Sequence, residues 1–122
     1  MNSSGRQNAK SFTKTLTLYS RKVGENGPDF VVLHGLFGSG KNWRSFAGSL
    51  GEDFQVWTLD ARNHGDSPHA DSMSYQQMAE DVVRFFDGNE LENVILLGHS
   101  MGGKTALMFA HMHPERIEKI IV

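Results

Sequence analysis

Short runs of large apolar residues alternate along this chain with segments whose apolar positions recur every three or four residues. The runs lie at 30–33, 54–59 and 94–97, and each is bounded by polar or turn-forming residues. Runs of this length are typical of strands buried on both faces of a parallel sheet. Another strand is predicted to begin at Lys119.

Helices are predicted between these strands at 43–50, 74–88 and 101–113. Gly51 is placed to stop the first helix, and Ser74 with Gln77 has the spacing of a capping box that starts the second. The apolar stripe of the second helix comprises Tyr75, Met78, Val82, Phe85 and Phe86. Strands alternating with helices in this way predict an α/β fold, a doubly wound and mostly parallel sheet with helices on both faces.

The N-terminus is predicted to be a polar tail of about ten residues followed by a first strand over 12–20. Residues 1–24 contain basic side chains but no Asp or Glu, a balance found in organelle transit peptides. The expected compartment is cytoplasmic, with a mitochondrial location as the alternative. No secretory signal core is present in the sequence.

Composition limits the function classes. The chain has 122 residues, a net charge of −2 and no cysteine. This charge gives no reason to expect nucleic acid as a partner, and the lack of cysteine excludes disulfide and thiolate chemistry. No apolar run approaches the roughly 18–20 residues that a transmembrane helix needs.

The segment Gly98-His99-Ser100-Met101-Gly102 joins a predicted strand to a predicted helix. This G-x-S-x-G spacing is typical of a nucleophile elbow, in which a sharp turn exposes the serine hydroxyl. The helix that follows directs unpaired backbone N–H groups toward the site. Ser100 is therefore a candidate nucleophile; the alternative is an ordinary Gly/Ser turn between a strand and a helix.

Two other polar residues directly follow predicted strands of the same direction. His34 follows the run at 30–33, and Asp60 follows the run at 54–59. Ligands of open α/β sheets bind beyond the carboxyl ends of the strands. His34, Asp60 and Ser100 are therefore expected to meet at one edge of the sheet.

The loop Gly35–Asn42 also matches G-x-x-x-x-G-K, which nearly completes a phosphate-binding P-loop. The P-loop requires Ser or Thr after the lysine to bind Mg²⁺, and Asn42 is a poorer ligand for that cation. Nucleotide binding is thus the weaker interpretation. The same loop can instead supply an oxyanion-hole N–H.

Three motifs together resemble the α/β-hydrolase superfamily: His34–Ser39, Asp60–Pro68 and Gly98–Lys104. They resemble in particular its small serine-esterase branch, which includes bacterial short-chain esterases and a mitochondrial abhydrolase-domain protein. The resemblance runs from about residue 12 to residue 122. It implies hydrolysis of small acyl esters or thioesters through an acyl-enzyme, without a metal or organic cofactor.

The resemblance also implies roles for individual residues. Ser100 is the implied nucleophile, and Leu36 or Phe37, with Met101, supplies the implied oxyanion-hole N–H groups. The residues implied to support the site without reacting are His34, Gly35, Asp60, Arg62, Asn63, His64, Gly98, His99 and Gly102.

The catalytic acid and base of this fold follow the serine in the chain. The histidines after Ser100 are His111 and His113, about 16 Å or more along the predicted helix axis at 1.5 Å per residue. Residues 11–122 are therefore expected to form the N-terminal half of an α/β-hydrolase domain that lacks the acid, the base histidine and the lid. The chain by itself is expected to be inactive or nearly so.

Two further expectations follow from the missing catalytic acid, base histidine and lid. The alternative interpretation is a truncated isoform or fragment that acts as a non-catalytic binding module. An incompletely covered sheet edge near residue 122 is expected to favour self-association.

Overall fold

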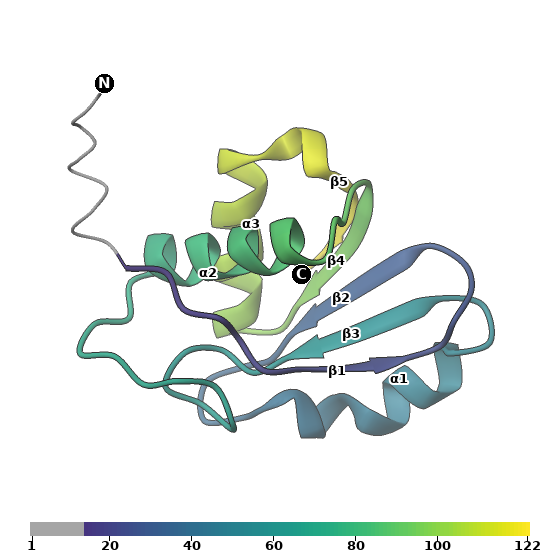
Figure 1. Ribbon diagram of the computed structural model, residues 1–122, viewed down its shortest axis with the longest axis horizontal. Helices are drawn as coiled ribbons and strands as arrows, with labels where there is room; N and C mark the ends of the chain where they lie inside the picture. The colour runs from purple at the N-terminus through teal and green to yellow at the C-terminus, as the bar shows by residue number, and fades with distance from the viewer. Residues whose placement is uncertain (1–13) are drawn as a thin grey trace.

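The computed structural model describes residues 14–122 as one sheet covered by helices on both faces (Figure 1). In this part of the chain the sheet has five strands in the order β1-β3-β2-β4-β5. The strands are β1 (Ser20–Val23), β2 (Asp29–Leu33), β3 (Gln55–Leu59), β4 (Val94–Gly98) and β5 (Ile117–Ile121). All neighbouring pairs are parallel except β1 and β3, which are antiparallel. The predicted fold class is confirmed.

Three α-helices connect the parallel strands: α1 (Arg44–Leu50), α2 (Tyr75–Gly88) and α3 (Met101–Met112). Short 3₁₀ helices at Gly40–Trp43 and Pro114–Arg116 precede α1 and β5. The predicted capping box of α2 is present, because Ser74 Oγ accepts from the Gln77 N–H and Gln77 Oε1 accepts from the Ser74 N–H. None of the helices in the described residues is long and apolar enough to cross a membrane.

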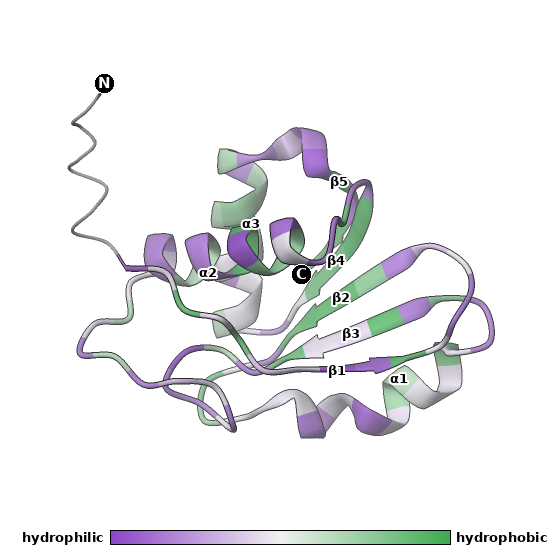
Figure 2. Ribbon diagram, viewed as in Figure 1, coloured by the Kyte–Doolittle hydropathy of each residue, from purple (hydrophilic) through white to green (hydrophobic). Residues whose placement is uncertain are grey.

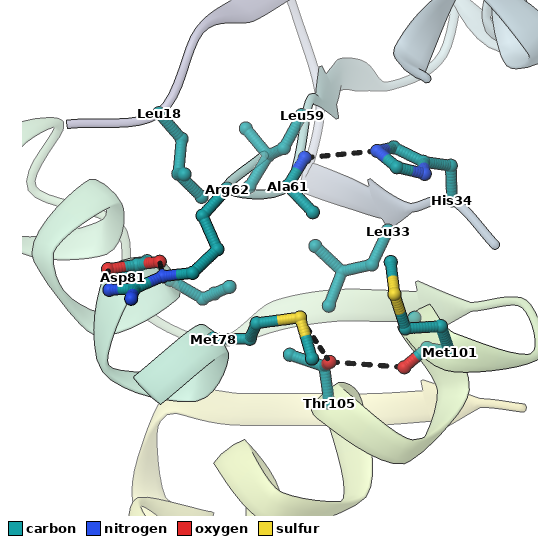
Figure 3. Close-up of a pocket in the computed structure, with 12 residues that line it drawn as sticks. Leu18, Leu33, His34, Leu59, Ala61, Arg62, Met78, Asp81, Met101 and Thr105 are labelled. Atoms are coloured by element: carbon teal, nitrogen blue, oxygen red, sulfur yellow. Dashed lines mark hydrogen bonds and ion pairs between the residues drawn. The ribbon is translucent and has the colours of Figure 1, made fainter. Parts of the chain in front are cut away.

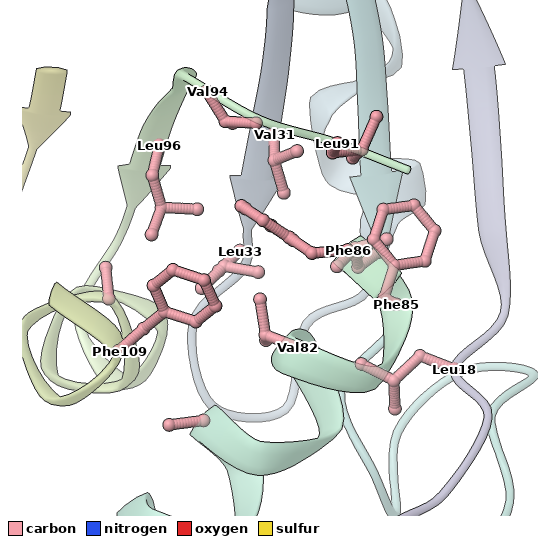
Figure 4. Packing of buried hydrophobic residues seen from close by; sticks show 13 residues of the cluster. Leu18, Val31, Leu33, Val82, Phe85, Phe86, Leu91, Val94, Leu96 and Phe109 are labelled. Atoms are coloured by element: carbon pink, nitrogen blue, oxygen red, sulfur yellow. The ribbon is translucent and has the colours of Figure 1, made fainter. Parts of the chain in front are cut away.

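The central strands direct alternate side chains to opposite faces of the sheet, as the period of a strand requires. Val31 and Leu33 face α2 and α3, where the rings of Phe86 and Phe109 lie 4.6 Å apart (Figure 4). The opposite face packs against α1 through a separate apolar cluster, which includes Phe30. Figure 2 shows that β2 and β4 are hydrophobic along most of their length. These strands therefore form a rigid platform for the loops at their carboxyl ends.

The predicted position of the first strand is wrong. Residues 14–19 are not in a strand, and β1 begins only at Ser20. Side chains bind backbone groups of this segment: the Leu16 N–H donates to Asp81, and the Tyr19 N–H donates to Ser67. The proposed polar tail at 1–10, and residues 11–13 of the predicted strand, lie outside the described residues. At the other end of the sheet, β5 begins two residues before the predicted Lys119, because Ile117 already pairs with Val94.

The order of the strands reverses at β2. After β2 the chain passes through α1 to β3 on one side, and after β3 it crosses through α2 to β4 on the other side. A reversal of this kind opens a crevice at the carboxyl ends of the two strands it separates. His34, Asp60 and Ser100 directly follow or closely follow β2, β3 and β4 at this edge, as expected.

Candidate active site

Ser100 lies at the sharp turn between β4 and α3. Its backbone has φ 55° and ψ −113°, in the left-handed half of the φ range that residues with a side chain rarely occupy. Two glycines permit the turn. A Cβ atom on Gly98 would lie 2.2 Å from the Gly102 oxygen, and one on Gly102 would lie 2.1 Å from the Leu33 oxygen. The predicted strand, tight turn and helix are all present, and the Ser100 side chain is exposed.

Two backbone N–H groups near Ser100 remain available for a ligand. Met101 is the first residue of α3, so its N–H has no partner within the helix. Among residues 14–122, neither the Met101 N–H nor the Leu36 N–H donates to a protein acceptor. The Phe37 N–H, by contrast, donates to Nε2 of His64 at 3.1 Å. The sequence offered the N–H groups of Leu36 and Phe37 as oxyanion-hole donors. The Leu36 N–H is the one of the two that has no protein acceptor.

His34 links the loop after β2 to the loop after β3. Its Nε2 accepts from the Ala61 N–H at 3.0 Å (Figure 3), and its Nδ1 lies 2.7 Å from the Gly35 oxygen. A backbone N–H only donates and a carbonyl only accepts, so the ring proton is on Nδ1. The side chain is 1% exposed, and this burial lowers the pKa of His34. His34 is a neutral brace whose two nitrogens are both engaged.

His64 repeats this arrangement. Nε2 accepts from the Phe37 N–H, and Nδ1 donates to the Arg62 oxygen at 2.9 Å, which again assigns the proton to Nδ1. The rings of His34 and His64 lie 5.2 Å apart. Both side chains therefore hold loops in place, and neither has a ring nitrogen left to accept a proton from Ser100.

Asp60 is fully buried at the end of β3 and accepts four hydrogen bonds. Two come from the Arg21 guanidinium at 2.9 and 3.3 Å, and two come from the backbone N–H groups of Gly40 and Asp66 at 2.7 and 2.9 Å. Burial alone would raise the pKa of Asp60, but these hydrogen bonds outweigh it and the pKa lies below its ordinary value. Asp60 joins β1 and two loops.

Arg62 forms a buried ion pair with Asp81 of α2. Its Nε and Nη2 donate to the two carboxylate oxygens at 2.8 and 3.0 Å, and the exposed fractions of the two side chains are 1% and 0% (Figure 3). The Arg62 guanidinium also donates to the Ser72 and Lys14 oxygens. The sequence reasoning missed Asp81. The sequence feature that could have revealed Asp81 is its helical spacing from Met78 and Phe85, which places a charged residue on the apolar side of α2.

The remaining predicted site residues also support loops. Asn63 has φ 66°, and its Oδ1 accepts from the Ala70 N–H at 2.7 Å. The exposed ring of His99 packs against Trp43 at 6.1 Å between centroids.

From Phe37 to Asn42 every backbone N–H of the Gly35–Asn42 loop already donates to a protein acceptor, in contrast to a phosphate cradle. Oδ1 of Asn42 accepts from the Ser39 N–H at 2.9 Å, in a capping box that starts the 3₁₀ helix. The Gly40 N–H donates to Asp60. These groups are therefore not available for a phosphate, which argues against the nucleotide-binding interpretation.

A surface pocket of about 370 Å³ lies beside Ser100. Its lining residues are Leu36, Met73, Tyr75, Met78, Ser100, Met101 and Lys104. Tyr75 belongs to the predicted apolar stripe of α2, but as the first residue of the helix it is 37% exposed and borders this pocket. Below the elbow, a small cavity of about 20 Å³ is lined by Met101, Thr105 and Met78 among others (Figure 3).

No side chain in residues 14–122 forms a hydrogen bond with Ser100 Oγ. Besides His34 and His64, the histidines near the elbow include His99, whose ring packs against Trp43. His111 lies in the last turn of α3, and His113 follows that helix and contacts Glu115. The described site thus contains an exposed serine, two available N–H groups and an adjacent pocket.

Comparison with known proteins agrees with this geometry. The family model described as alpha/beta hydrolase fold matches residues 28–122. The sn-1-specific diacylglycerol lipase ABHD11 of Xenopus laevis is 46% identical over 97 residues, covering 78% of this chain and 31% of that protein. Esterase YbfF of Escherichia coli is 38% identical over 96 residues, and the match covers 79% of this chain and 38% of that protein.

Among solved structures, a marine microorganism esterase superposes with a TM-score of 0.86 at 53% sequence identity. The match covers 87% of this chain and 41% of that one. The chain spans between 30% and 40% of the length of the curated relatives it matches. The family model covers most of the chain and the relatives include esterases and lipases, so this chain belongs to the α/β-hydrolase family.

Proposed function

We propose that Ser100 is the nucleophile of a serine hydrolase that cleaves small acyl esters or thioesters. Ser100 Oγ attacks the acyl carbon, and the carbonyl oxygen becomes an oxyanion that accepts from the Leu36 and Met101 N–H groups. The alcohol or thiol then leaves, and water releases the acid from the acyl-enzyme. A base must take the Oγ proton and pass it to the departing alcohol or thiol; we assign this role to a histidine, with a carboxylate partner, outside residues 14–122.

The observation that carries this proposal is the backbone of Ser100. A non-glycine residue at φ 55° between two sterically required glycines is costly, by about 1–3 kcal/mol. The turn raises the hydroxyl at the end of β4, beside the first N–H of α3. An ordinary Gly/Ser turn would need neither this strain nor the two close backbone contacts.

The pocket beside Ser100 supports an acyl substrate. Leu36, Met73 and Met78 give it apolar walls, and Met101, the residue after the nucleophile, also lines it. The names of the relatives include a diacylglycerol lipase and two esterases, which supports the same substrate class.

A fluorophosphonate probe, which phosphonylates activated serines, tests the proposal in two proteins. One is this chain, and the other is a chimera in which it replaces the matching segment of the marine esterase. We expect rapid labelling of Ser100 in the chimera and slow or no labelling of the chain alone. Ser100→Ala should abolish labelling, and Ser45→Ala, at an exposed serine of α1, should not.

Circular dichroism shows which proteins are folded. A folded chimera that hydrolyses no acyl ester and is not labelled would refute the proposal, as would labelling that survives Ser100→Ala. Rapid labelling of the chain alone would refute the assignment of the base to a segment outside it.

A second candidate function is a non-catalytic binding module. It is favoured by one observation: both buried histidines at this edge already use both ring nitrogens, so neither can act as the base. In that case the chain would bind acyl compounds in its pocket without turnover. The chimera discriminates the two candidates, because only a competent elbow would hydrolyse ester there.

A further inference from the structure

The pocket beside Ser100 contains one charged side chain. Leucine, methionine and tyrosine side chains make most of its lining, and Lys104 supplies the charge. A lysine on an exposed helix face is commonly no more than a solvated surface residue. Three features of Lys104 argue for more than that.

The first feature is its position relative to the nucleophile. The Lys104 N–H donates to the Ser100 oxygen at 3.1 Å, so Lys104 lies one helical turn after Ser100. Ser100 caps the start of α3, and side chains of a helix tilt toward its N-terminus, so the Lys104 side chain leans toward the end of α3 that carries Ser100. The rise between the two positions is about 6 Å at 1.5 Å per residue, within reach of a four-carbon side chain and a short acyl group.

The second feature is the direction of the side chain. The Lys104 ammonium lies 5.8 Å from the centroid of the Tyr75 ring, at the start of α2. An ammonium within about 6 Å of an aromatic ring is attracted to its face. Lys104 therefore reaches across the pocket from α3 toward α2.

The third feature is the lack of a compensating carboxylate. None of the ion pairs within residues 14–122 includes Lys104; their cations are Arg21, Arg62, His113 and Arg116. Lys104 is exposed, and an ammonium near a protein surface still attracts a nearby anion more strongly than an ammonium in bulk water does. The pocket thus combines an apolar surface, a nucleophile and one uncompensated positive charge.

We propose that Lys104 is a specificity-determining residue, which binds an anionic group placed a few bonds from the scissile ester. This inference rests on the proposed function of Ser100. The anion belongs either to the acyl group, as in a half-ester of a short dicarboxylic acid, or to the leaving alcohol. Both sources share the same chemistry, a carboxylate or phosphate that accepts from the lysine ammonium.

Equilibrium binding tests the proposal without requiring turnover. The chain carrying Ser100→Ala is titrated with monomethyl succinate, with O-acetylglycolate and with neutral dimethyl succinate, and binding is followed by NMR. The first ester has its carboxylate on the acyl side, and the second has it on the alcohol side. We expect at least one anionic ester to bind about tenfold more tightly than the neutral ester, as a hydrogen bond to a charged group predicts.

The preference should disappear with Lys104→Met and persist with Lys104→Arg. Lys22→Met is the matched control, because the Lys22 ammonium also lies over an aromatic ring, that of Trp57 at 5.0 Å, but does not line the pocket. A preference for one of the two anionic esters assigns the anion to that side of the substrate.

Equal binding of all three esters, or an anion preference that survives Lys104→Met, would overturn the inference. The fluorophosphonate test of Ser100 is independent of these titrations. A failure of Lys104 to select anions is therefore distinguishable from a failure of Ser100 to act as a nucleophile.

Discussion

The Phe37 N–H donates to Nε2 of His64 over 3.1 Å, and this bond joins the loop after β2 to the loop after β3. The Phe37 side chain is 90% exposed and its φ is 65°, so packing of this side chain does not hold the loop. The loop also carries the Leu36 N–H that we propose as an oxyanion donor. His64 is therefore a positioning residue for that donor.

His64→Ala should release this loop. We expect a loss of stability of about 1 kcal/mol and at least about tenfold slower fluorophosphonate labelling in the chimera, because the donor is no longer fixed. His64→Gln, whose Oε1 can accept the same hydrogen bond, should restore part of the rate. His69→Ala, at an exposed residue of the neighbouring loop, is the control. An unchanged rate with His64→Ala would contradict the positioning role.

Gly102→Ala should prevent the elbow from forming, because the new Cβ would lie 2.1 Å from the Leu33 oxygen. We expect a loss of stability above about 3 kcal/mol, or no cooperative unfolding, in a urea titration. Gly48→Ala is the matched control, since its Cβ would meet no atom within 4 Å on α1. That variant should be more stable by about 0.5–1 kcal/mol. Similar midpoints for both variants would contradict the steric argument.

Arg62→Met should leave the Asp81 carboxylate buried without its cation. Removal of one partner of a buried ion pair costs about 3–5 kcal/mol, which is measurable as a lower urea midpoint. Asp81→Asn should cost less, since the amide oxygen still accepts from Arg62. The ion pair between Arg116 and Asp87 provides the comparison because the Asp87 carboxylate is 63% exposed, and Asp87→Asn should change stability by less than about 1 kcal/mol. Equal losses of stability for Arg62→Met and Asp87→Asn would contradict the argument that burial makes the first pair important.

The free energy of unfolding should decrease as the pH is lowered, because His34 takes up a proton. Burial lowers the pKa of folded His34, so the unfolded chain binds the proton more readily. The contribution of His34 is complete above its ordinary pKa of about 6.5 and is lost as pH falls through the lower folded value. His34→Gln should flatten urea midpoints between about pH 7.5 and 5. Asp60 does not confound this range, because its lowered pKa places its effect at more acidic pH. An equal pH slope in both proteins would refute this assignment.

The edge strand β5 should promote self-association of the chain. Ile121 and Val122 are 46% and 68% exposed at the side of the sheet opposite β1. Exposed apolar strand edges pair with other chains, and a charge on the edge opposes this. Light scattering after size exclusion should show oligomers for the parent chain and more monomer for Ile121→Lys. A parent chain that is monomeric at every concentration would contradict the expectation.

The sequence by itself determined the features that depend on neighbours along the chain. Apolar runs and helical spacing located β2, β3, β4 and the three helices, because burial on one or two faces leaves a local period in the sequence. Gly98 and Gly102 located the elbow around Ser100, since steric conflict at a sharp turn restricts the residue types nearby. The capping box of α2 was readable for the same reason.

The tertiary structure alone decided which polar groups meet. Three contacts join elements that are separate in the chain: the ion pair of Arg62 with Asp81, the hydrogen bond from Phe37 to His64, and the hydrogen bond from Ala61 that fixes the proton of His34. No local sequence pattern encodes these contacts. The start of β1 was mispredicted because Asp81 and Ser67 bind the segment before it. Lys104 follows Ser100 by one helical turn, but only the packing of α2 against α3 brings the Tyr75 ring to its ammonium. Periodicity determines which face of an element is buried, whereas the partner on that face depends on how the elements pack.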